Sequence, residues 1–250
     1  PLYDPVEHGH LERLLHQNRL PGTYSFAMDC PLPETITRLQ QLLQQTREMT
    51  GVRESMMPLP EDGTLPSWPP LRDDHRQAAV LFLLYPDDHF EPTGGDPLDL
   101  LHLVFILRPD YDGTHGGQIS LPGGRQENDE PLIQTATRET HEEVGVDPAQ
   151  VEILGRLPAF HVYASNHNVF PYVGFTPRRP RFVPCEVEVA EIIEAPLKAL
   201  MDPDNQRSEQ RELTRWGKTR VPYFAIDHHK VWGATAIMLA EFLALIREAQ

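Results

Sequence analysis

GRQENDEPLIQTATRETHEEVGV, residues 124–146, is the most informative stretch of this sequence. Pro131 suits the first position of a helix, and Glu130 before it places a negative charge at the positive end of that helix. Gly145 is placed to end the helix. Between these limits, small and apolar side chains recur at helical spacing: Leu132, Ile133, Ala136 and Thr140. The stretch therefore predicts a helix with one inward face.

Three carboxylates share one surface of this predicted helix, because Glu139, Glu142 and Glu143 stand at i, i+3 and i+4. Like charges at this spacing repel one another, which is unfavourable in a helix with a purely structural role. A hard divalent cation removes that penalty, since Mg2+ takes oxygen ligands and shares them with substrate phosphates. Arg138 can pair with a carboxylate and orient it. The pattern predicts a metal site; an acidic, solvated helix face is the alternative.

The stretch resembles the Nudix box, the signature of hydrolases that cleave nucleoside diphosphates linked to another moiety. Its spacing is G-x5-E-x7-R-E-x-x-E-E-x-G-hydrophobic, from Gly124 to Val146. Thr140 departs from the family, which prefers an aliphatic residue there, although the methyl group of threonine can still pack. The helix carboxylates and the arginine of the box are all present, so the resemblance implies an enzyme; a non-catalytic nucleotide-binding module is the alternative.

The resemblance also implies how a metal is held. Glu139, Glu142 and Glu143 would bind Mg2+ or Mn2+, and the backbone carbonyl of Gly123 would complete the coordination. Glu139, Glu142 and Arg138 are the catalytic residues expected on the helix, with Arg138 also supporting the metal ligands.

The composition limits the classes of partner. The 250 residues include 22 Lys and Arg against 37 Asp and Glu, a formal net charge of −15. This balance argues against broad binding to nucleic acids or membrane surfaces, so an anionic substrate needs local arginines or a metal. Cys30 and Cys185 have no metal-site or CxxC spacing, which fits a reduced protein. Without a run of transmembrane length or a targeting pattern, a cytoplasmic protein with a small-molecule nucleotide substrate is expected.

The chain divides into two predicted parts. Residues 1–70 are expected to form an extension, with a helix from Glu34 to about Met49 and an extended proline-rich segment from 58 to 70. A subunit contact through this extension would make the protein a homodimer. Residues 76–250 are expected to form the catalytic domain.

The catalytic domain is predicted to be an α/β/α sandwich with a mixed β-sheet, because strands precede and follow the helix of the box and a further helix ends the chain. Strands are predicted at 78–84, 100–107, 151–160, 167–175 and 187–193, with a strand pair at 212–224 around Gly217-Lys218; helices are predicted from Pro196-Leu197 and over 231–249.

The flanks of the box resemble the coenzyme A pyrophosphatase branch of the family. In HGGQISLPGG (115–124), Gly117 and the Pro-Gly-Gly ending match, with Leu121 in place of the branch's phenylalanine. Arg108 matches the arginine that ends the preceding strand, whereas Gly113 stands where a second arginine is typical. Similar segments at 188–197, 221–224 and 231–236 extend the resemblance over residues 76–246.

The branch implies hydrolysis of the pyrophosphate of coenzyme A or acyl-coenzyme A to 3′,5′-ADP and (acyl-)4′-phosphopantetheine. Another Nudix activity, on ADP-ribose, NADH or dinucleoside polyphosphates, is the alternative. By resemblance, Arg108 would contact the substrate, and Glu188 would be the catalytic base that some Nudix enzymes take from a loop after the box. A solvated arginine and a surface carboxylate are the alternatives. His115 fits a loop histidine and a substrate contact equally well.

Overall fold

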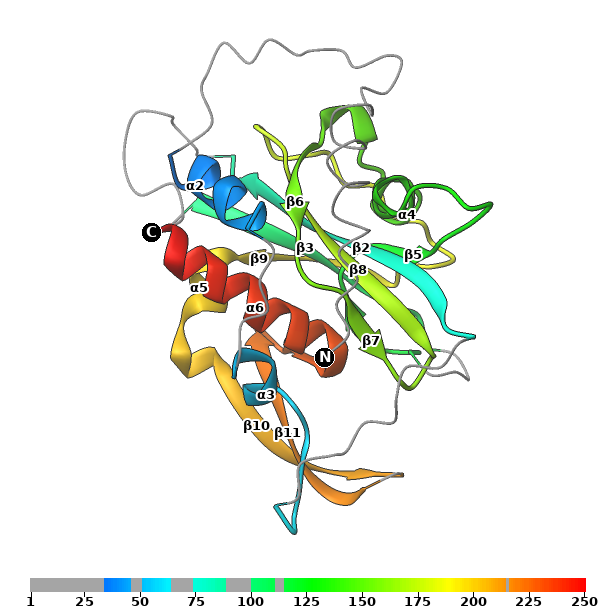
Figure 1. The fold of residues 1–250 in the computed structure, drawn as a ribbon, viewed down its shortest axis with the longest axis vertical. Coiled ribbons are helices and arrows are strands. Elements are labelled where there is room, and N and C mark those ends of the chain that lie inside the picture. The colour runs from blue at the N-terminus through cyan, green and yellow to red at the C-terminus, as the bar shows by residue number, and fades with distance from the viewer. Residues whose placement is uncertain (1–33, 46–50, 64–73, 89–99, 111–114, 215) are drawn as a thin grey trace. The chain divides into compact units, whose positions relative to one another are not determined.

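In the computed structural model of the chain, strand β2 (Arg76–Pro86) lies in the middle of the larger of two β-sheets (Figure 1). The structure describes residues 34–45, 51–63, 74–88, 100–110, 115–214 and 216–250. Its helices are α2 (Glu34–Leu43), α3 (Val52–Ser55), α4 (Leu132–Val144), α5 (Leu197–Met201) and α6 (Gly233–Ala249), with 3-10 turns at Pro148–Gln150 and Pro203–Asn205. Among these residues, no helix combines the length and the apolarity needed to cross a membrane.

The larger sheet follows the order β4-β3-β2-β8-β6, with β5 beside β2, β7 beside β8 and β9 beside β3. β2 and β8 run parallel, with Arg76 opposite His167, whereas β2 and β3 run antiparallel. The sheet is therefore mixed, as predicted. The remaining strands are β3 (Leu101–Leu107), β4 (Ile119–Ser120), β5 (Gly123–Arg125), β6 (Glu152–Arg156), β7 (Phe160–Val162), β8 (His167–Phe175) and β9 (Glu191–Pro196).

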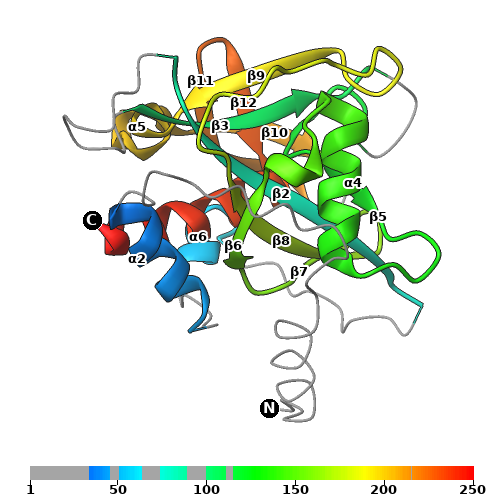
Figure 2. The same cartoon turned by 90° about the horizontal axis from the view of Figure 1, so that it is seen from above.

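Strand β2 is almost continuously apolar because both of its faces are covered. Helix α4 lies on one side of the sheet, and α6 and α2 lie on the other (Figure 2). Leu81 belongs to the core under α4 together with Ala136 of that helix. Phe82, the next residue, points the opposite way and stacks on Phe242 of α6 with ring centroids 4.7 Å apart. The predicted α/β/α sandwich is confirmed.

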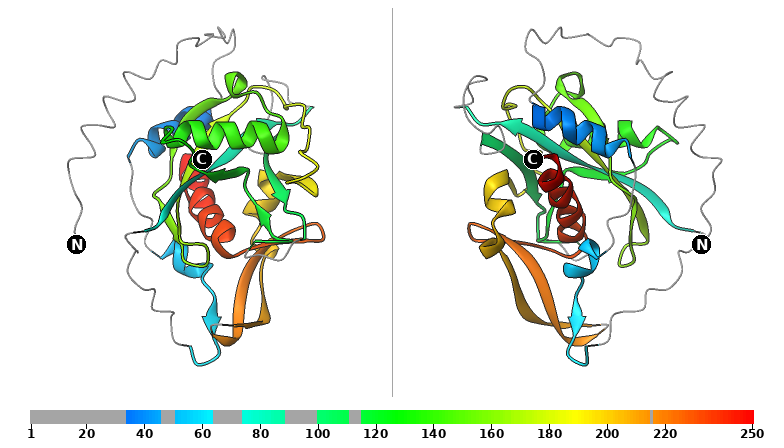
Figure 3. Two further views of the ribbon diagram at one scale, coloured as in Figure 1. Left: turned by 90° about the vertical axis from the view of Figure 1, so that its right-hand side faces the viewer. Right: turned by 60° about the vertical axis from the view of Figure 1, so that its left-hand side comes forward.

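The smaller sheet joins strands from distant parts of the chain. It contains β1 (Leu59–Pro60), β10 (Gln206–Leu213), β11 (Gly217–Ile226) and β12 (His229–Trp232). Figure 3 shows β1 beside the β10–β11 hairpin. Helix α2 buries Ile36 and Leu39 in the same core as α6. The predicted boundary of the extension stays a prediction, and its residues 1–33, 46–50 and 64–70 lie outside the described residues.

Several predicted element boundaries were wrong. The strand predicted at 187–193 is β9 at Glu191–Pro196, because the backbone N–H groups of Glu188 and Val189 both donate to the carbonyl of Cys185 and form a turn first. The terminal helix begins at Gly233 rather than at residue 231, since β12 continues through Trp232. The β10–β11 turn precedes Gly217, which pairs with Leu213.

Candidate active site

Arg138 organises the outer part of the site. Its Nε lies 3.2 Å from both carboxylate oxygens of Glu130, and its Nη2 lies 2.7 Å from Oε1. Its Nη1 donates to Glu139 at 3.0 Å and to Glu142 at 2.9 Å. The hydrogen bonds from Arg138 hold the pKa of the Glu130 carboxyl below its usual range. One guanidinium therefore joins the loop before α4 to two carboxylates on the helix.

Glu139 lies directly against the backbone of β5. A Cβ atom at Gly124 would come within 2.4 Å of the carboxyl carbon of Glu139, so the absence of a side chain at Gly124 makes this approach possible. Burial raises the pKa of the Glu139 carboxyl, and the neighbouring charge of Arg138 opposes that effect. The carboxylate of Glu139 is therefore held between β5 on one side and the guanidinium of Arg138 on the other.

Glu143 is the most deeply buried carboxylate of the site, with 1% of its side chain exposed. Its Oε2 accepts a hydrogen bond from the backbone N–H of Gly123 at 2.8 Å, and its Oε1 accepts one from Nη2 of Arg108 at 3.3 Å. Burial raises the pKa of Glu143 to about 7, although Arg108 and the Gly123 N–H favour the ionised form. The effect of burial on this carboxyl therefore outweighs the two contacts that favour its ionised form.

Glu139 and Glu143 meet a third carboxylate, Glu188, from the turn before β9. One oxygen atom from each of the three lies within 4.8 Å of the others. We refer to Glu139, Glu143 and Glu188 as the acidic trio. The charge of Glu188 contributes to raising the pKa of both helix carboxyls. An all-oxygen donor set with excess negative charge fits a hard divalent cation such as Mg2+ or Mn2+.

The other predicted site residues occupy distinct places. Glu142 is about half exposed and pairs with Arg138, outside the acidic trio. The carbonyl of Gly123 accepts a hydrogen bond from Arg108 at 3.1 Å. Within the described residues, Nε and Nη1 of Arg108 make no hydrogen bond, and a quarter of its side chain is exposed. His115 lies in a turn, with Nδ1 3.5 Å from Oε1 of Gln118.

The effect of Arg76 and Arg125 on His167 has no counterpart in the sequence-based predictions. Burial lowers the pKa of the His167 imidazole, and the charges of Arg76 and Arg125 lower it further. The parallel pairing of β2 with β8 brings Arg76 opposite His167. No local pattern indicates this pairing, since Arg76 and His167 are far apart in the sequence.

Comparison with known proteins shows that residues 67–217 match the NUDIX domain family. Nudix hydrolase 15, mitochondrial, of Arabidopsis thaliana is 33% identical over 209 residues, which are 80% of this chain and 66% of that protein. Nudix hydrolase 22, chloroplastic, of the same plant is 32% identical, again over 80% of this chain and 66% of that protein. The matches thus span slightly less than two thirds of the plant proteins. The uncharacterized Nudix hydrolase NudL of Pectobacterium atrosepticum is 34% identical over 72% of this chain and 88% of its own length.

Proposed function

The chain belongs to the Nudix hydrolases, and we propose that it hydrolyses the pyrophosphate of coenzyme A or of acyl-coenzyme A. The products would be 3′,5′-ADP and (acyl-)4′-phosphopantetheine. The acidic trio carries the proposal of a hydrolase, because its oxygen donors suit the cation that a diphosphate substrate requires. The choice of coenzyme A rests on the similarity of residues 115–124 and the later segments to the coenzyme A pyrophosphatase branch.

The proposed reaction adds water to one phosphorus atom and breaks its bond to the bridging oxygen. A divalent cation held by Glu139 and Glu143, the two helix carboxylates of the acidic trio, would neutralise the diphosphate and lower the pKa of water. Arg138 positions Glu139 and Glu142, while Arg108 and the Gly123 N–H position Glu143. Glu188, from its turn, is the proposed base that takes the proton of the attacking water.

The arginines close to the acidic site support the proposal of a strongly anionic substrate. In a chain with a formal net charge of −15, the charges of Arg76 and Arg125 both act on His167, and the carbonyl of Arg125 accepts a hydrogen bond from Arg138. Arg125 therefore adjoins the Nudix helix. Nε and Nη1 of Arg108, which make no hydrogen bond to any described residue, would contact a substrate phosphate. Arginines close to an acidic site suit a substrate with phosphates besides the one that reacts.

We expect coenzyme A to be the fastest substrate in a panel containing its 3′-dephospho form, ADP-ribose, NADH and diadenosine polyphosphates, assayed with Mg2+ or Mn2+. The preference for coenzyme A over its dephospho form should shrink in Arg108→Ala, because only the full substrate loses a charge-assisted contact. The ratio of the rate on coenzyme A to the rate on its dephospho form distinguishes two effects of Arg108→Ala. Loss of a contact with the substrate's 3′-phosphate changes the ratio, whereas loss of the contact with Glu143 slows both substrates and leaves the ratio unchanged. Faster hydrolysis of ADP-ribose or NADH would overturn the coenzyme A assignment, and no hydrolysis of any member would indicate a non-catalytic module.

Glu188→Gln is expected to lower turnover by roughly 10²–10⁴-fold, the usual contribution of a general base. The pH–rate profile should lose the limb that belongs to this base, while the affinity for Mn2+ changes only a few-fold. Glu186→Gln is the matched control, since Glu186 is exposed and lies two residues away outside the acidic trio. An unchanged pH–rate profile would make Glu188 a surface carboxylate, whereas a large loss of Mn2+ affinity would make it a metal ligand.

A further inference from the structure

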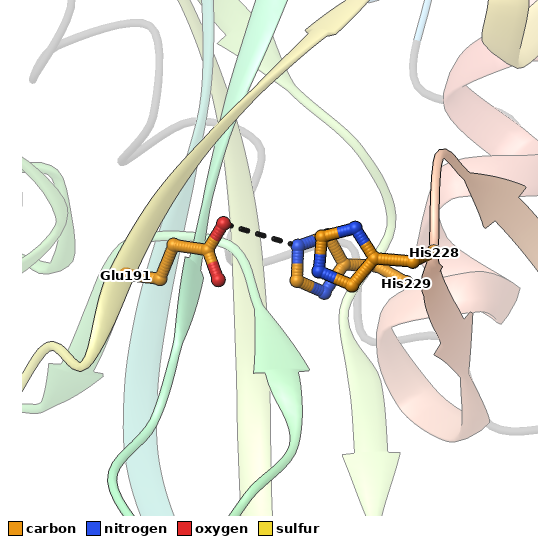
Figure 4. A group of neighbouring side chains, drawn as sticks. All are labelled: Glu191, His228 and His229. Atoms are coloured by element: carbon orange, nitrogen blue, oxygen red, sulfur yellow. Dashed lines mark hydrogen bonds and ion pairs between the residues drawn. The ribbon is translucent and has the colours of Figure 1, made fainter.

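A second group of metal-ligating side chains lies outside the acidic trio. Glu191, at the first position of β9, faces His228 and His229 from the β11–β12 hairpin (Figure 4). One ligand atom from each residue lies within 4.8 Å of the others. Nε2 of His229 is 3.2 Å from Oε1 of Glu191, and the two imidazole rings have their centroids 3.9 Å apart. Two imidazoles and a carboxylate thus converge on one place.

The hairpin explains why consecutive histidines point the same way. Ile226 pairs with His229, so Asp227 and His228 form a two-residue turn, with Asp227 at a φ of 50°. Consecutive residues within a strand point to opposite faces, but His228 lies in the turn and can fold over His229. Lys230 follows within β12 and pairs with Glu209 instead. The charge of Lys230, the cationic residue next to His229 in the sequence, is therefore neutralised by Glu209.

We propose that Glu191, His228 and His229 form a binding site for Zn2+ or a similar divalent transition metal. Imidazole nitrogen with carboxylate oxygen is a donor set that Zn2+ favours, whereas Mg2+ favours oxygen ligands alone. Ligand bonds of about 2.0–2.1 Å in a tetrahedron place neighbouring donor atoms roughly 3.3–3.4 Å apart. The 3.2 Å between His229 and Glu191 is close to that spacing. His228 and Glu191 are exposed, so an ion can enter and water can take the fourth position.

The site would connect the two sheets. Glu191 pairs with Leu107 of β3 in the larger sheet, while His229 belongs to the smaller sheet. Glu191 also follows Glu188 by three residues. A bound ion would therefore attach the end of the turn that carries Glu188 to the β11–β12 hairpin. The proposed metal site depends only on Glu191, His228 and His229. The proposal therefore does not depend on which substrate is hydrolysed at the acidic trio.

The test is calorimetric titration of the purified full chain with Zn2+ in saturating Mg2+, which occupies all-oxygen sites. Compared with the parent, His229→Ala and Glu191→Gln should each bind one Zn2+ ion fewer or bind that ion at least about 100-fold more weakly. Such a loss exceeds the roughly 10–100-fold fall in metal affinity that follows the loss of a residue that only supports a ligand. Asp227→Asn, in the same turn, is the matched control and should bind Zn2+ as the parent does.

Glu191→Gln keeps the size of an exposed side chain, so it tests the site even if His229→Ala proves unstable. Equal Zn2+ stoichiometry and affinity in the parent, in Glu191→Gln and in a folded His229→Ala would overturn the proposal and leave the contact between His229 and Glu191 as an ordinary ion pair. This readout requires no turnover, and a failed coenzyme A assay would leave it unchanged.

Discussion

Glu143→Gln is expected to lower turnover by roughly 10²–10³-fold in saturating Mg2+ or Mn2+, the scale of losing one positioned electrostatic group. The amide keeps the size of the side chain, but it removes the charge from the most buried member of the acidic trio. Steady-state rates on the preferred substrate measure the loss. Glu127→Gln is the matched control, because Glu127 is exposed, precedes α4 and lies outside the acidic trio. A parent-like rate in Glu143→Gln would show that the site lies elsewhere.

The pH dependence of Mn2+ binding is a second, independent test of the role of Glu143. Burial raises the pKa of Glu143 from 4.5 to about 7. Without metal, the folded chain keeps this proton longer than the unfolded chain, so the stability that Glu143 contributes is complete below pH 4.5 and is lost as the pH rises through 7. A cation requires the ionised form, and Mn2+ affinity should therefore rise between about pH 6 and about pH 8 in the parent but not in Glu143→Gln.

Gly124→Ala is expected to lower turnover by roughly 10²-fold while the chain remains folded, because a misplacement of about 1 Å in a catalytic group has effects on this scale. The new Cβ atom would meet the carboxylate of Glu139 at 2.4–2.5 Å, and the end of that flexible side chain would have to move out of the acidic trio. Mn2+ affinity should fall together with turnover. Activity equal to that of the parent would mean that Glu139 needs no close approach to β5.

The neighbouring substitution is the control for this prediction. At Gly123, with a φ of 151°, a Cβ atom would meet the carbonyl oxygen of Ala79 at 2.4 Å and the Cα atom of Val80 at 2.6 Å. These are backbone atoms of the central strand, which cannot rotate away. Gly123→Ala should therefore reduce the free energy of unfolding by at least about 3 kcal/mol, measured by chemical denaturation. The opposite pattern, with Gly124→Ala unfolded and Gly123→Ala stable, would contradict the account of both glycines.

Local patterns in the sequence were enough to predict the helix of the site and the layers of the fold. Gly145 ends α4 as predicted, and helical spacing brings Glu139 and Glu143 to one place because residues at i and i+4 share a face. The strand predicted at 78–84 is confirmed as part of β2, which is covered on both faces. These features could be predicted because each depends on local periodicity or on the conformation of a single glycine; Pro131, predicted at the first position of the helix, is instead its N-cap.

The contacts that bring these local features together are made between segments distant in the sequence. Only the tertiary structure shows these contacts. Glu188, named as the catalytic base by resemblance, meets Glu139 and Glu143 from a turn that was predicted as a strand, and Glu142 pairs with Arg138 although its spacing equally suits a ligand. Glu191 meets the histidine pair through the approach of two separate sheets. Spacing along a helix places side chains on a face, but the partner that each one contacts depends on strand pairing between distant segments, which leaves no periodic signal in the sequence.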